Sequence, residues 1–466
     1  MKQRWQFILV LLFAIVMIFP RLSERGLWAS HEARAAQNTV SLLDDSPGVL
    51  PHLFDGQTEL QKPPGYYWLS ALAAMITGDV NEWSVRLPAA LAALLTVLAI
   101  YGYLVAKKRP LAGFIAALML VTLVRFTGMA RVARIDMPLT AAITCGLLVW
   151  HLGYANRWSL LIASPFIAFA VLLKGPIGFA LPAVVVLAVY AMEKRRPPIG
   201  MLILSFLVIA GLSLPWFVWA NRETDGEFFR VFVWYHNIER ALGGSESLAS
   251  YPWWFYLPRL LLDAMPWTPL FVVLLVRRSG SFGLWWFLSM LVLLSCSKFK
   301  RVDYLLPALP GLAIYLGCGA ESLYSAMSST RQWMMRWVFL LVLMGCVVGW
   351  WGHDRWITPK EAARLDPTPF AKLIREQVPA PEPILLFRVE SHLLAFELGH
   401  PVLSLVEWHH LNQWLQSPGE HSFVLPLEFV EECQRNVWTR GIVEVARSES
   451  VCPKLHRPIV LMRTSP

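Results

Sequence analysis

Long apolar runs, separated by short polar connections, recur along most of the chain. Most of these runs approach the ~20 residues that an α-helix needs to cross the hydrocarbon core of a membrane. The pattern predicts a polytopic α-helical membrane protein with roughly eleven spans. The predicted spans are residues 5–20, 85–106, 110–125, 137–153, 158–173, 176–192, 199–220, 253–275, 281–296, 304–321 and 332–351.

Two other apolar segments need separate interpretations. The N-terminal stretch MKQRWQFILVLLFAIVMIFP resembles a signal peptide, but no small-residue cleavage site follows it. We therefore expect an uncleaved signal anchor. The run YYWLSALAAMIT at 66–77 is too short for a span, and we expect a partly inserted or interfacial helix there.

Positive charges in the connections orient the predicted spans, because cytoplasmic loops carry an excess of Lys and Arg. If the predicted spans cross the membrane in order, one set of connections carries most of these charges, and we assign it to the cytoplasmic side. It contains MKQR, Lys107-Lys108-Arg109, Arg157, Lys194-Arg195-Arg196, Arg277-Arg278 and Arg331. The outward segments are then 21–84, 126–136, 174–175, 221–252, 297–303 and 352–466. Lys298, Lys300 and Arg301 lie outward against this rule, so we expect their loop to hold an anion.

The tail after residue 357 has a different pattern from the rest of the chain. Its apolar stretches PILLFRV, SFVLPLEFV, GIVEVA and PIVLM alternate with segments such as HHLNQWLQ, which is typical of a small α/β unit. We expect a transmembrane domain at 1–351, with outward loops at 21–84 and 221–252, and an extracytoplasmic α/β domain at 352–466. Cys433 and Cys452 could form a disulfide in such a tail.

Composition and charge narrow the choice of partners. The chain of 466 residues is 56% hydrophobic and 16% charged, whereas soluble domains are about a quarter charged. The net charge of +9 lies mainly in short connections, which fits topology signals and anionic lipid headgroups better than a nucleic-acid groove. We therefore expect membrane lipids, and no nucleic acid, among the partners.

Polar residues of both charges cluster in the outward segments. A carboxylate there can act as a general base for a hydroxyl group or bind a divalent cation. Converging Arg and Lys side chains suit a phosphate-bearing substrate, so the clusters favour chemistry on a lipid-linked phosphate. The candidates are the acids Glu32, Asp44, Asp45, Asp55, Glu59, Asp136, Glu239 and Asp303 and the bases Arg34, Lys62, Arg131, Arg134, Lys174, Arg240, Lys298 and Arg301.

Several of these residues, and two histidines beside them, also have a structural explanation that the sequence leaves open. Glu32 and Arg34 could form a surface ion pair, and Asp136 could cap the helix that it opens. The other structural explanations are snorkelling of Lys62 to headgroups, a solvated helix junction at Lys174, a surface stripe of His236 and Arg240, and a structural role for His31.

Several motifs follow one another in a specific order within residues 1–350. They are HEAR, QKPPGYYWL, VRLPAAL, ARIDMPLT, LLKGPIGF, FVWYHNIERA and SKFKRVDYLLPALPGLA. In this order they resemble the ArnT/PMT-like GT-C glycosyltransferases, bacterial relatives of lipid A aminoarabinose transferases and protein O-mannosyltransferases. The resemblance implies a bacterial inner-membrane enzyme that transfers a sugar from a polyprenyl-phosphate donor to a lipid or protein acceptor on the extracytoplasmic face.

The resemblance also assigns residues to catalysis. The family's first outward loop commonly carries an Asp-Glu pair followed by x-Arg, and Glu32 and Arg34 match the second acid and the arginine. His31 stands in place of the usual leading Asp. Either Glu32 or Asp136 then takes over its task, or His31 itself acts as the base, since an unperturbed imidazole has a pKa near ~6.5. Asp136 matches a second family acid, which makes Glu32 and Asp136 candidate ligands for a divalent cation.

The resemblance further implies that cationic and phenolic residues contact the carrier phosphate, where they would stabilise its departure during inverting sugar transfer. The candidates for this role are Arg34, Lys62, Arg240, Tyr304, Lys298 and Arg301. Two other functions stay open at this point. A transporter or flippase for lipid-linked sugars predicts charged residues within the spans, and a non-catalytic homologue that binds the carrier is favoured by His31.

Overall fold

The computed structural model describes residues 3–44, 50–239, 250–276, 281–389, 391–399, 401–437 and 441–464. The chain divides into two compact units. Unit 1 comprises Met1–Leu22, Leu60–Ala73 and Arg86–Trp350, and unit 2 comprises Ser23–Glu59, Ala74–Val85 and Trp351–Pro466. The part of the first outward loop up to Glu59 therefore groups with the tail, and not with the apolar helices.

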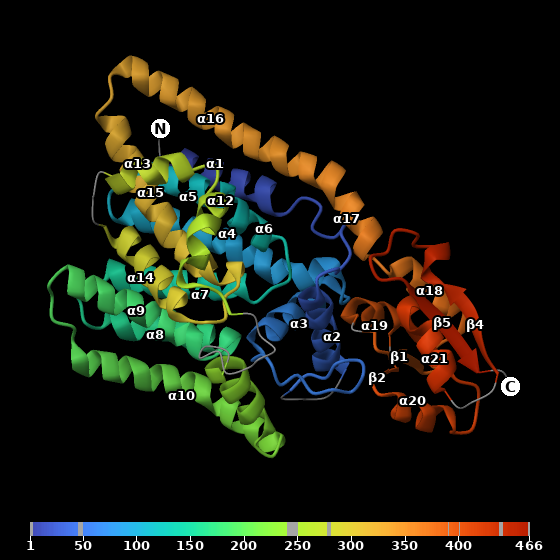
Figure 1. Cartoon of the computed structure of the whole chain (residues 1–466). Helices are drawn as coiled ribbons and strands as arrows, with labels where there is room; N and C mark the ends of the chain where they lie inside the picture. The colour runs from blue at the N-terminus through green and yellow to red at the C-terminus, as the bar shows by residue number, and fades with distance from the viewer. Residues whose placement is uncertain are drawn as a thin grey trace. The chain divides into compact units, whose positions relative to one another are not determined.

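Helices account for the apolar part of the chain (Figure 1), and each predicted span coincides with a helix or a pair of consecutive helical segments. These helices are α1 (Gln3–Ile18), α4 (Glu82–Ala106), α5 (Pro110–Thr122), α7 (Asp136–Leu152), α8 (Ser159–Lys174), α9 (Pro176–Met192), α10 (Ile199–Glu223), α12 (Tyr256–Asp263), α13 (Thr268–Val276), α14 (Phe282–Cys296), α15 (Leu309–Ser325) and α16 (Ser329–Gly352). The short run at 66–77 forms α3 (Gly65–Thr77), so a helix is confirmed there.

Length and composition set how many helices can cross a membrane. Within the described residues, four helical segments are long and apolar enough to cross a membrane, or up to six if each of two bent helix pairs counts as one span. The bent pairs are α5 with α6 (Val124–Ala130) and Trp253–Asp263 with α13, and five further apolar helices have 10–17 residues. The predicted total of roughly eleven crossings stays a prediction. The four qualifying segments are Glu82–Ala106, Ile199–Glu223, Val302–Ser325 and Ser329–Gln377.

The predicted span at 253–275 is broken in the structure. Its two halves are bent by 119° relative to each other, at a break that contains Pro266. Proline lacks a backbone N–H and disfavours the helical conformation of the residue before it, so a helix readily ends there. The indole of Trp267 in the same break donates a hydrogen bond of 2.8 Å to Oγ1 of Thr122 at the end of α5, which attaches the bend to its neighbour.

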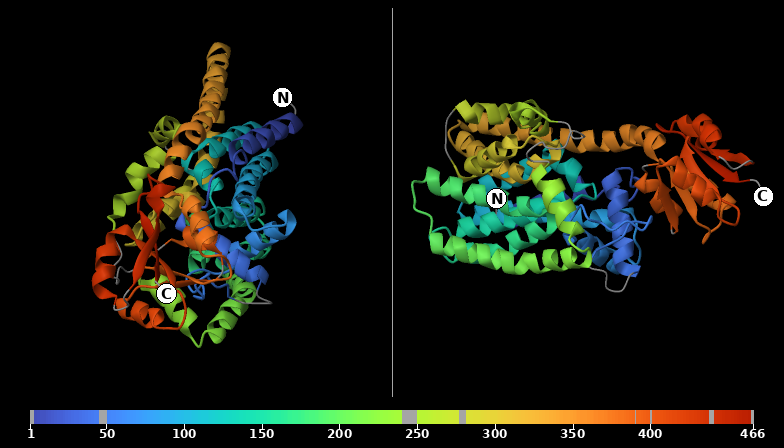
Figure 2. Two further views of the ribbon diagram at one scale, coloured as in Figure 1. Left: turned by 90° about the vertical axis from the view of Figure 1, so that its right-hand side faces the viewer. Right: turned by 60° about the horizontal axis from the view of Figure 1, so that its bottom comes forward.

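Helix α8 holds a central place in unit 1. It packs against α7, α9 and α10, and Figure 1 and the right-hand view of Figure 2 show α8, α9 and α10 running side by side. Helix α9 in turn packs against α14. The C-terminal end of α8 and the N-terminal end of α9 are therefore held by several neighbours, and this junction carries the candidate site.

Unit 2 contains a five-stranded sheet with the strand order β2-β1-β3-β5-β4. Strands β1, β2 and β3 are parallel, and β5 pairs antiparallel with both β3 and β4. Each of the four apolar stretches of the tail supplies one strand, whereas the pattern of the tail did not predict β2. The strands are β1 (Ile384–Phe387), β2 (Val402–Leu405), β3 (Ser422–Pro426), β4 (Ile442–Arg447) and β5 (Ile459–Thr464).

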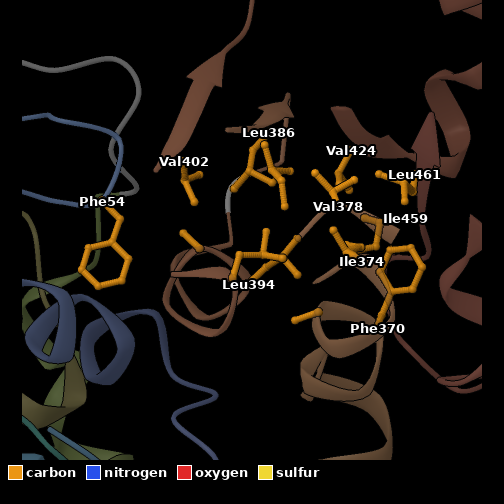
Figure 3. Close-up of a cluster of buried hydrophobic side chains, with 14 of the residues drawn as sticks. Phe54, Phe370, Ile374, Val378, Leu386, Leu394, Val402, Val424, Ile459 and Leu461 are labelled. Atoms are coloured by element: carbon orange, nitrogen blue, oxygen red, sulfur yellow. The ribbon is translucent and has the colours of Figure 1, made fainter. Parts of the chain in front are cut away.

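Helices cover both faces of this sheet. Helices α18 (Thr368–Gln377) and α19 (His392–Leu398) pack on one face, and α20 (Trp408–Leu415) and α21 (Val430–Asn436) pack on the other. The first outward loop adds helix α2 (Ser30–Asp44), which packs against α19. Phe54 of this loop joins the same buried cluster as Leu394 of α19 (Figure 3). This apolar contact explains why the loop and the tail form one unit.

The two cysteines of the tail lie on opposite faces of the sheet. Cys433 is buried beside α20 in one apolar cluster, whereas Cys452 is buried in the cluster that contains α18 and α19. Both thiols are free. The disulfide suggested by their position in the sequence is therefore wrong, because the sheet separates the two side chains.

Candidate functional site

A cavity of about 420 Å³ lies within unit 1. Its polar lining includes Lys62, Lys174, His236 and Tyr304, and its walls are largely apolar. A volume of this size is typical of small-ligand sites. The remaining lining residues are Gln61, Leu139, Ile177, Ala180, Leu181, Phe232, Asn237, Leu293, Leu294, Cys296, Ser297 and Phe299.

The KGP sequence at 174–176 places Lys174 in the lining of this cavity. Lys174 ends α8, Gly175 has a φ of +74°, and Pro176 opens α9. Positive φ is accessible to glycine at little cost, and proline is favoured at the first position of a helix. A Cβ atom at position 175 would also lie 2.4 Å from Cζ of Phe232. The junction therefore requires glycine, and the lysine before it is held at a helix end.

The KPPG sequence at 62–65 delivers Lys62 to the same cavity. Pro64 accepts a hydrogen bond from the backbone N–H of Trp68, at 3.0 Å, and so starts α3. Gly65 approaches the end of α8 so closely that a Cβ atom there would lie 2.8 Å from the carbonyl oxygen of Leu172. Close backbone approach of this kind excludes larger residues. Two lysines from distant motifs therefore line one cavity.

Asp136 positions the second lysine. Nζ of Lys174 donates a hydrogen bond to Oδ1 of Asp136, and Nε of Arg134 lies 3.4 Å from its Oδ2. Asp136 is only 2% exposed. The Lys174 ammonium also lies 4.3 Å from the centroid of the Tyr304 ring, a favourable cation–π distance. Asp136 and Tyr304 together fix where this ammonium points.

The same ion pairs continue away from the cavity as a chain of alternating charges. Nη1 of Arg134 lies 2.5 Å from Oδ2 of Asp303, and Nη1 of Arg125 lies 3.4 Å from Oδ1 of that residue. Arg125 also contacts Asp263 at 2.9 Å. Networks of partly buried pairs hold their members more rigidly than single surface pairs do. Asp303 thus connects the segment before Tyr304 to the segment before α7.

The capping alternative for Asp136 is wrong. The residue that precedes α7 is Ile135, and no side chain caps the helix. Asp136 instead lies in the first turn, where a negative charge is favoured by the helix dipole, and its carboxylate is turned to Lys174 and Arg134.

The HEAR motif lies in unit 2, at the start of α2. Glu32 is fully buried, and both of its carboxylate oxygens lie 3.1 Å from Nη2 of Arg25. The alternative of a surface pair between Glu32 and Arg34 is therefore wrong. Residues two apart on a helix point in different directions, and each of these two has its own partner. His31 stands beside them in the first turn and is half-buried.

Arg34 pairs with Glu59, an acid that belonged to the outward cluster but matched no family position. Nε and Nη2 of Arg34 lie 2.8 Å and 3.2 Å from the two carboxylate oxygens of Glu59. Asn38 donates a further hydrogen bond of 3.1 Å to this fully buried carboxylate. Nη2 donates a hydrogen bond, and Nε adds a second charged contact; charge-assisted contacts of this kind are among the stronger polar contacts in proteins. In the sequence, the only indication that Glu59 belongs near the functional residues is its position three residues before Lys62.

The remaining candidates occupy the basic loop and the region after η1 (Phe229–Glu239). Among the described residues that line the cavity, neither Lys298 nor Arg301 occurs. Lys298 is exposed, and Arg301 lies 3.8 Å from Asp303. Lys300 is buried and donates to the carbonyl oxygens of Tyr251 and Ser297, so this lysine holds loop backbone together. Arg240 lies outside the residues that the structure describes.

Comparisons with known proteins agree with the order of the motifs. The family model for dolichyl-phosphate-mannose-protein mannosyltransferase (PMT) matches residues 6–224. An undecaprenyl phosphate-alpha-4-amino-4-deoxy-L-arabinose arabinosyl transferase of Pseudomonas fluorescens is 31% identical over 336 residues, or 68% of this chain and 56% of the relative. The chain belongs to the ArnT/PMT-like GT-C glycosyltransferases. The resemblance expected from the motifs is thereby confirmed.

Other members of the ArnT/PMT-like family match over similar lengths. A transferase of the same kind from Pseudomonas paraeruginosa is 30% identical over 335 residues, which cover 68% of this chain and 59% of that relative. The chain thus spans less than two thirds of the length of these curated relatives. Like them, it is a multi-pass membrane protein, with several apolar helices in unit 1.

Solved structures share the fold of this ArnT/PMT-like chain. The crystal structure of ArnT from Cupriavidus metallidurans bound to undecaprenyl phosphate superposes with a TM-score of 0.80 at 18% identity and covers 100% of both chains. The archaeal oligosaccharyltransferase AglB from Archaeoglobus fulgidus gives a TM-score of 0.57 at 13% identity and covers 92% of this chain and 69% of that chain. The fold is that of the GT-C membrane enzymes.

A divalent cation does not fit the two expected ligands in this arrangement. Both oxygens of Glu32 contact Arg25, and both oxygens of Asp136 face a cationic side chain. A metal ion needs several free oxygen or nitrogen donors at short distance. Among the residues that the structure describes, no group of three His, Cys, Asp or Glu side chains is placed to hold one. Arg25, Arg134 and Lys174 instead supply the positive charge beside these two carboxylates.

Proposed function

We propose that this protein transfers a sugar from a polyprenyl-phosphate donor to a lipid or protein acceptor. One observation carries the proposal: the cavity of unit 1 combines two lysines and a tyrosine with apolar walls. That combination matches a ligand with an anionic phosphate joined to a hydrocarbon chain. The relatives named for transfer of 4-amino-4-deoxy-L-arabinose from undecaprenyl phosphate support the same donor class.

Lys62 and Lys174 would hold the donor phosphate, and Tyr304 would donate a hydrogen bond to it. Charge-assisted hydrogen bonds of this kind strengthen as negative charge develops on the leaving group. Asp136 acts as a positioning residue, because it orients the Lys174 ammonium that lines the cavity. Arg240, Lys298, Arg301 and Arg34 remain candidates for contact with the phosphate.

The transfer itself needs only three changes in bonding. The acceptor oxygen attacks the anomeric carbon, the bond from that carbon to the phosphate oxygen breaks, and the acceptor proton passes to a base. Polyprenyl phosphate leaves with the electron pair of the broken bond, and the configuration inverts. Of the candidates Glu32, Asp136 and His31, we propose His31 as the base, because it stands at the position where the family usually has an aspartate.

The proposed location is the bacterial inner membrane, with the site on the extracytoplasmic face. The distribution of Lys and Arg in the short connections supports this orientation. Lys62 and the Lys174 junction then belong to outward segments, together with the HEAR motif. Membrane lipids surround the protein as its general partners, and nucleic acid is not among them.

The test follows a labelled sugar. Purified protein in lipid would be incubated with a radiolabelled undecaprenyl-phosphate sugar and a membrane extract. We expect label in another lipid or in protein with the wild type and with Lys194→Ala, an exposed lysine outside the cavity lining. Lys62→Ala should lose about a hundredfold or more in rate, as when a preorganised charge contact is removed. Label that stays on the carrier across a panel of sugars, or crosses the bilayer without transfer, would overturn the proposal.

A further inference from the structure

The sheet of unit 2 has a topological switch point between β1 and β3. The chain passes from β1 through α19 to β2, and then from β2 through α20 to β3 on the other side of β1. Leu394 of α19 packs on one face of the sheet, and Leu411 of α20 packs on the opposite face. Ligands of open α/β sheets bind beside such a point, outside the carboxyl ends of the parallel strands.

A second pocket lies at this position. Its volume is about 670 Å³, which is within the usual range for organic ligands. It is formed where the three parallel strands end and where the chain returns before β5. The lining residues are Arg388 and Val389 after β1, Ser404, Leu405 and Val406 around the end of β2, Pro426, Leu427, Glu428 and Phe429 after β3, and His456, Arg457 and Pro458 before β5.

Arg388 presents a fixed guanidinium to this pocket. Its backbone has a φ of +56°, which is unusual for a residue other than glycine. Its Nε donates a hydrogen bond of 2.8 Å to the carbonyl oxygen of Val406, and its guanidinium carbon lies 5.1 Å from the centroid of Phe429. Its Nη1 also lies 3.5 Å from Oε1 of Glu432, which holds the guanidinium further. A planar guanidinium held in this way is well suited to bind a phosphate group through the N–H groups of its Nη2.

The opposite side of the pocket adds positive charge. Arg457 and His456 are exposed in the loop before β5, and Pro458 restricts the backbone of that loop. No described residue forms an ion pair or a side-chain hydrogen bond with Arg457. Glu428 is the one acid among the described lining residues. Two arginines and a histidine therefore face a pocket with a single carboxylate, which favours an anionic ligand.

We propose that this pocket is a binding site for a phosphorylated sugar. The arginines would hold the phosphate, and the remaining volume, larger than a phosphate ion needs, would hold the sugar ring. Ser404 and the backbone groups at the strand ends can pair with hydroxyl groups. The ligand is either a soluble sugar phosphate or the phosphorylated sugar headgroup of a glycolipid. The site lies within unit 2 and goes beyond the proposed sugar transfer, because it requires nothing from the cavity of unit 1.

Binding can be measured by isothermal titration calorimetry on the full-length protein in detergent. The probes are glucose 1-phosphate, glucose and inorganic phosphate. The test variant is Arg457→Gln, at an exposed position whose loss should not unfold the unit. The matched control is Arg435→Gln, which removes another arginine of unit 2 with an exposed side chain, one that pairs with Glu431 outside the pocket. Lys62→Ala separates this site from the donor cavity.

We expect glucose 1-phosphate to bind to the wild type, to Arg435→Gln and to Lys62→Ala, and to bind at least about tenfold more weakly to Arg457→Gln. Glucose should not bind. Equal affinity in Arg457→Gln and the wild type would overturn the proposal, and so would binding lost only in Lys62→Ala. If the soluble probe fails, vesicles of phosphatidylcholine with or without a phosphorylated glycolipid decide the source. A glycolipid response that Arg457→Gln removes assigns the site to the headgroup, and no response to either probe overturns it.

Discussion

Lys174 and Asp136 form a largely buried, hydrogen-bonded ion pair across two helices of unit 1. The lysine ends α8 and the aspartate opens α7. Because the lysine also lines the cavity, the aspartate controls a cation that would meet the donor phosphate. The pair therefore links the stability of the helix packing to the charge of the site.

Removal of both partners should cost less than the sum of the two single removals. Asp136→Asn leaves the Lys174 ammonium without its carboxylate and should lower the free energy of unfolding by roughly 3 kcal/mol. In the double variant with Lys174→Met, the total loss should fall short of the sum of the single losses by about 1–3 kcal/mol. Unfolding in mixed detergent would measure these values.

The control for this cycle is an exposed ion pair of the same helical unit. Glu227 and Arg230 lie 3.8 Å apart with side chains that are 55% and 79% exposed. The corresponding variants Glu227→Gln and Arg230→Met should show little coupling, since exposed pairs contribute about 0–1 kcal/mol. Simple additivity in the Asp136 and Lys174 cycle would contradict the assigned positioning role.

His31 can be tested by restoring the acid that the family usually has. If His31 accepts the acceptor proton, His31→Gln should lower kcat by about 10²–10⁴-fold. His31→Asp should retain activity and move the acidic limb of the rate profile to lower pH, because an ordinary Asp titrates below an ordinary His. The measurement is kcat as a function of pH for the three proteins. An acidic limb that stays in place in His31→Asp would show that another group is the base.

The contact between Arg34 and Glu59 predicts a structural phenotype for the motif arginine. Arg34→Ala removes both charged contacts to a fully buried carboxylate, which keeps its hydrogen bond from Asn38, and should destabilise unit 2 by roughly 3 kcal/mol. Arg34→Lys should rescue it poorly, because an ammonium cannot make both contacts. Limited proteolysis of residues 23–59 would report the loss. A variant that folds normally but binds donor weakly would instead support the phosphate role.

Glu397 makes the stability of unit 2 depend on pH. Burial, followed by the nearby charges of Glu82 and Asp366, raises the pKa of this carboxyl above its ordinary value. The folded protein then binds the proton more tightly than the unfolded chain does. The contribution to stability is therefore present below the unfolded pKa and is lost as the pH rises through the folded pKa.

Glu397→Gln should accordingly raise the Tm of unit 2 near about pH 7, and the gain should vanish as the pH falls to about 4. Thermal unfolding followed by circular dichroism at several pH values would show this. Glu376→Gln, at an exposed position of α18, provides the matched control. A gain that is the same at every pH would show that protonation of Glu397 is not its cause.

Chelation directly tests the expectation that Glu32 and Asp136 bind a divalent cation. Because both oxygens of Glu32 and of Asp136 already contact cationic side chains, EDTA should leave the rate of sugar transfer unchanged. Lys174 and Arg134 supply at Asp136 the positive charge that a metal would otherwise supply. Activity that is lost with EDTA and returns with Mg²⁺, Mn²⁺ or Zn²⁺ would show that these contacts rearrange around an ion.

The helices could be predicted from the pattern of apolar residues alone. The predicted span at 199–220 corresponds to Ile199–Glu223, and that at 176–192 to Pro176–Met192. A continuous apolar run long enough for a membrane satisfies its backbone groups within itself, so no knowledge of its neighbours is needed. The prediction of one continuous helix fails at 253–275. The helix is broken at Pro266, and the hydrogen bond from Trp267 to Thr122 attaches the bend to α5.

The motifs could identify the family, because KPPG, KGP and the segment before α15 keep their residue types and their order. Which side chains meet depended on folding. Lys62, Lys174 and Tyr304 line one cavity, and two glycines permit the close packing there: Gly65 lies against the backbone of Leu172, and Gly175 lies against the ring of Phe232. Periodicity carries no information about contacts between segments more than a hundred residues apart.

Pairing of charges was likewise decided only in three dimensions. Glu32 and Arg34 are neighbours in the sequence, yet Glu32 pairs with Arg25 and Arg34 pairs with Glu59. Cys433 and Cys452 share a short tail, yet a sheet separates them. Local sequence sets which segments are helical and which are apolar. The partner of each buried charge or thiol depends instead on the packing of distant elements, because a few ångströms determine whether two side chains can touch.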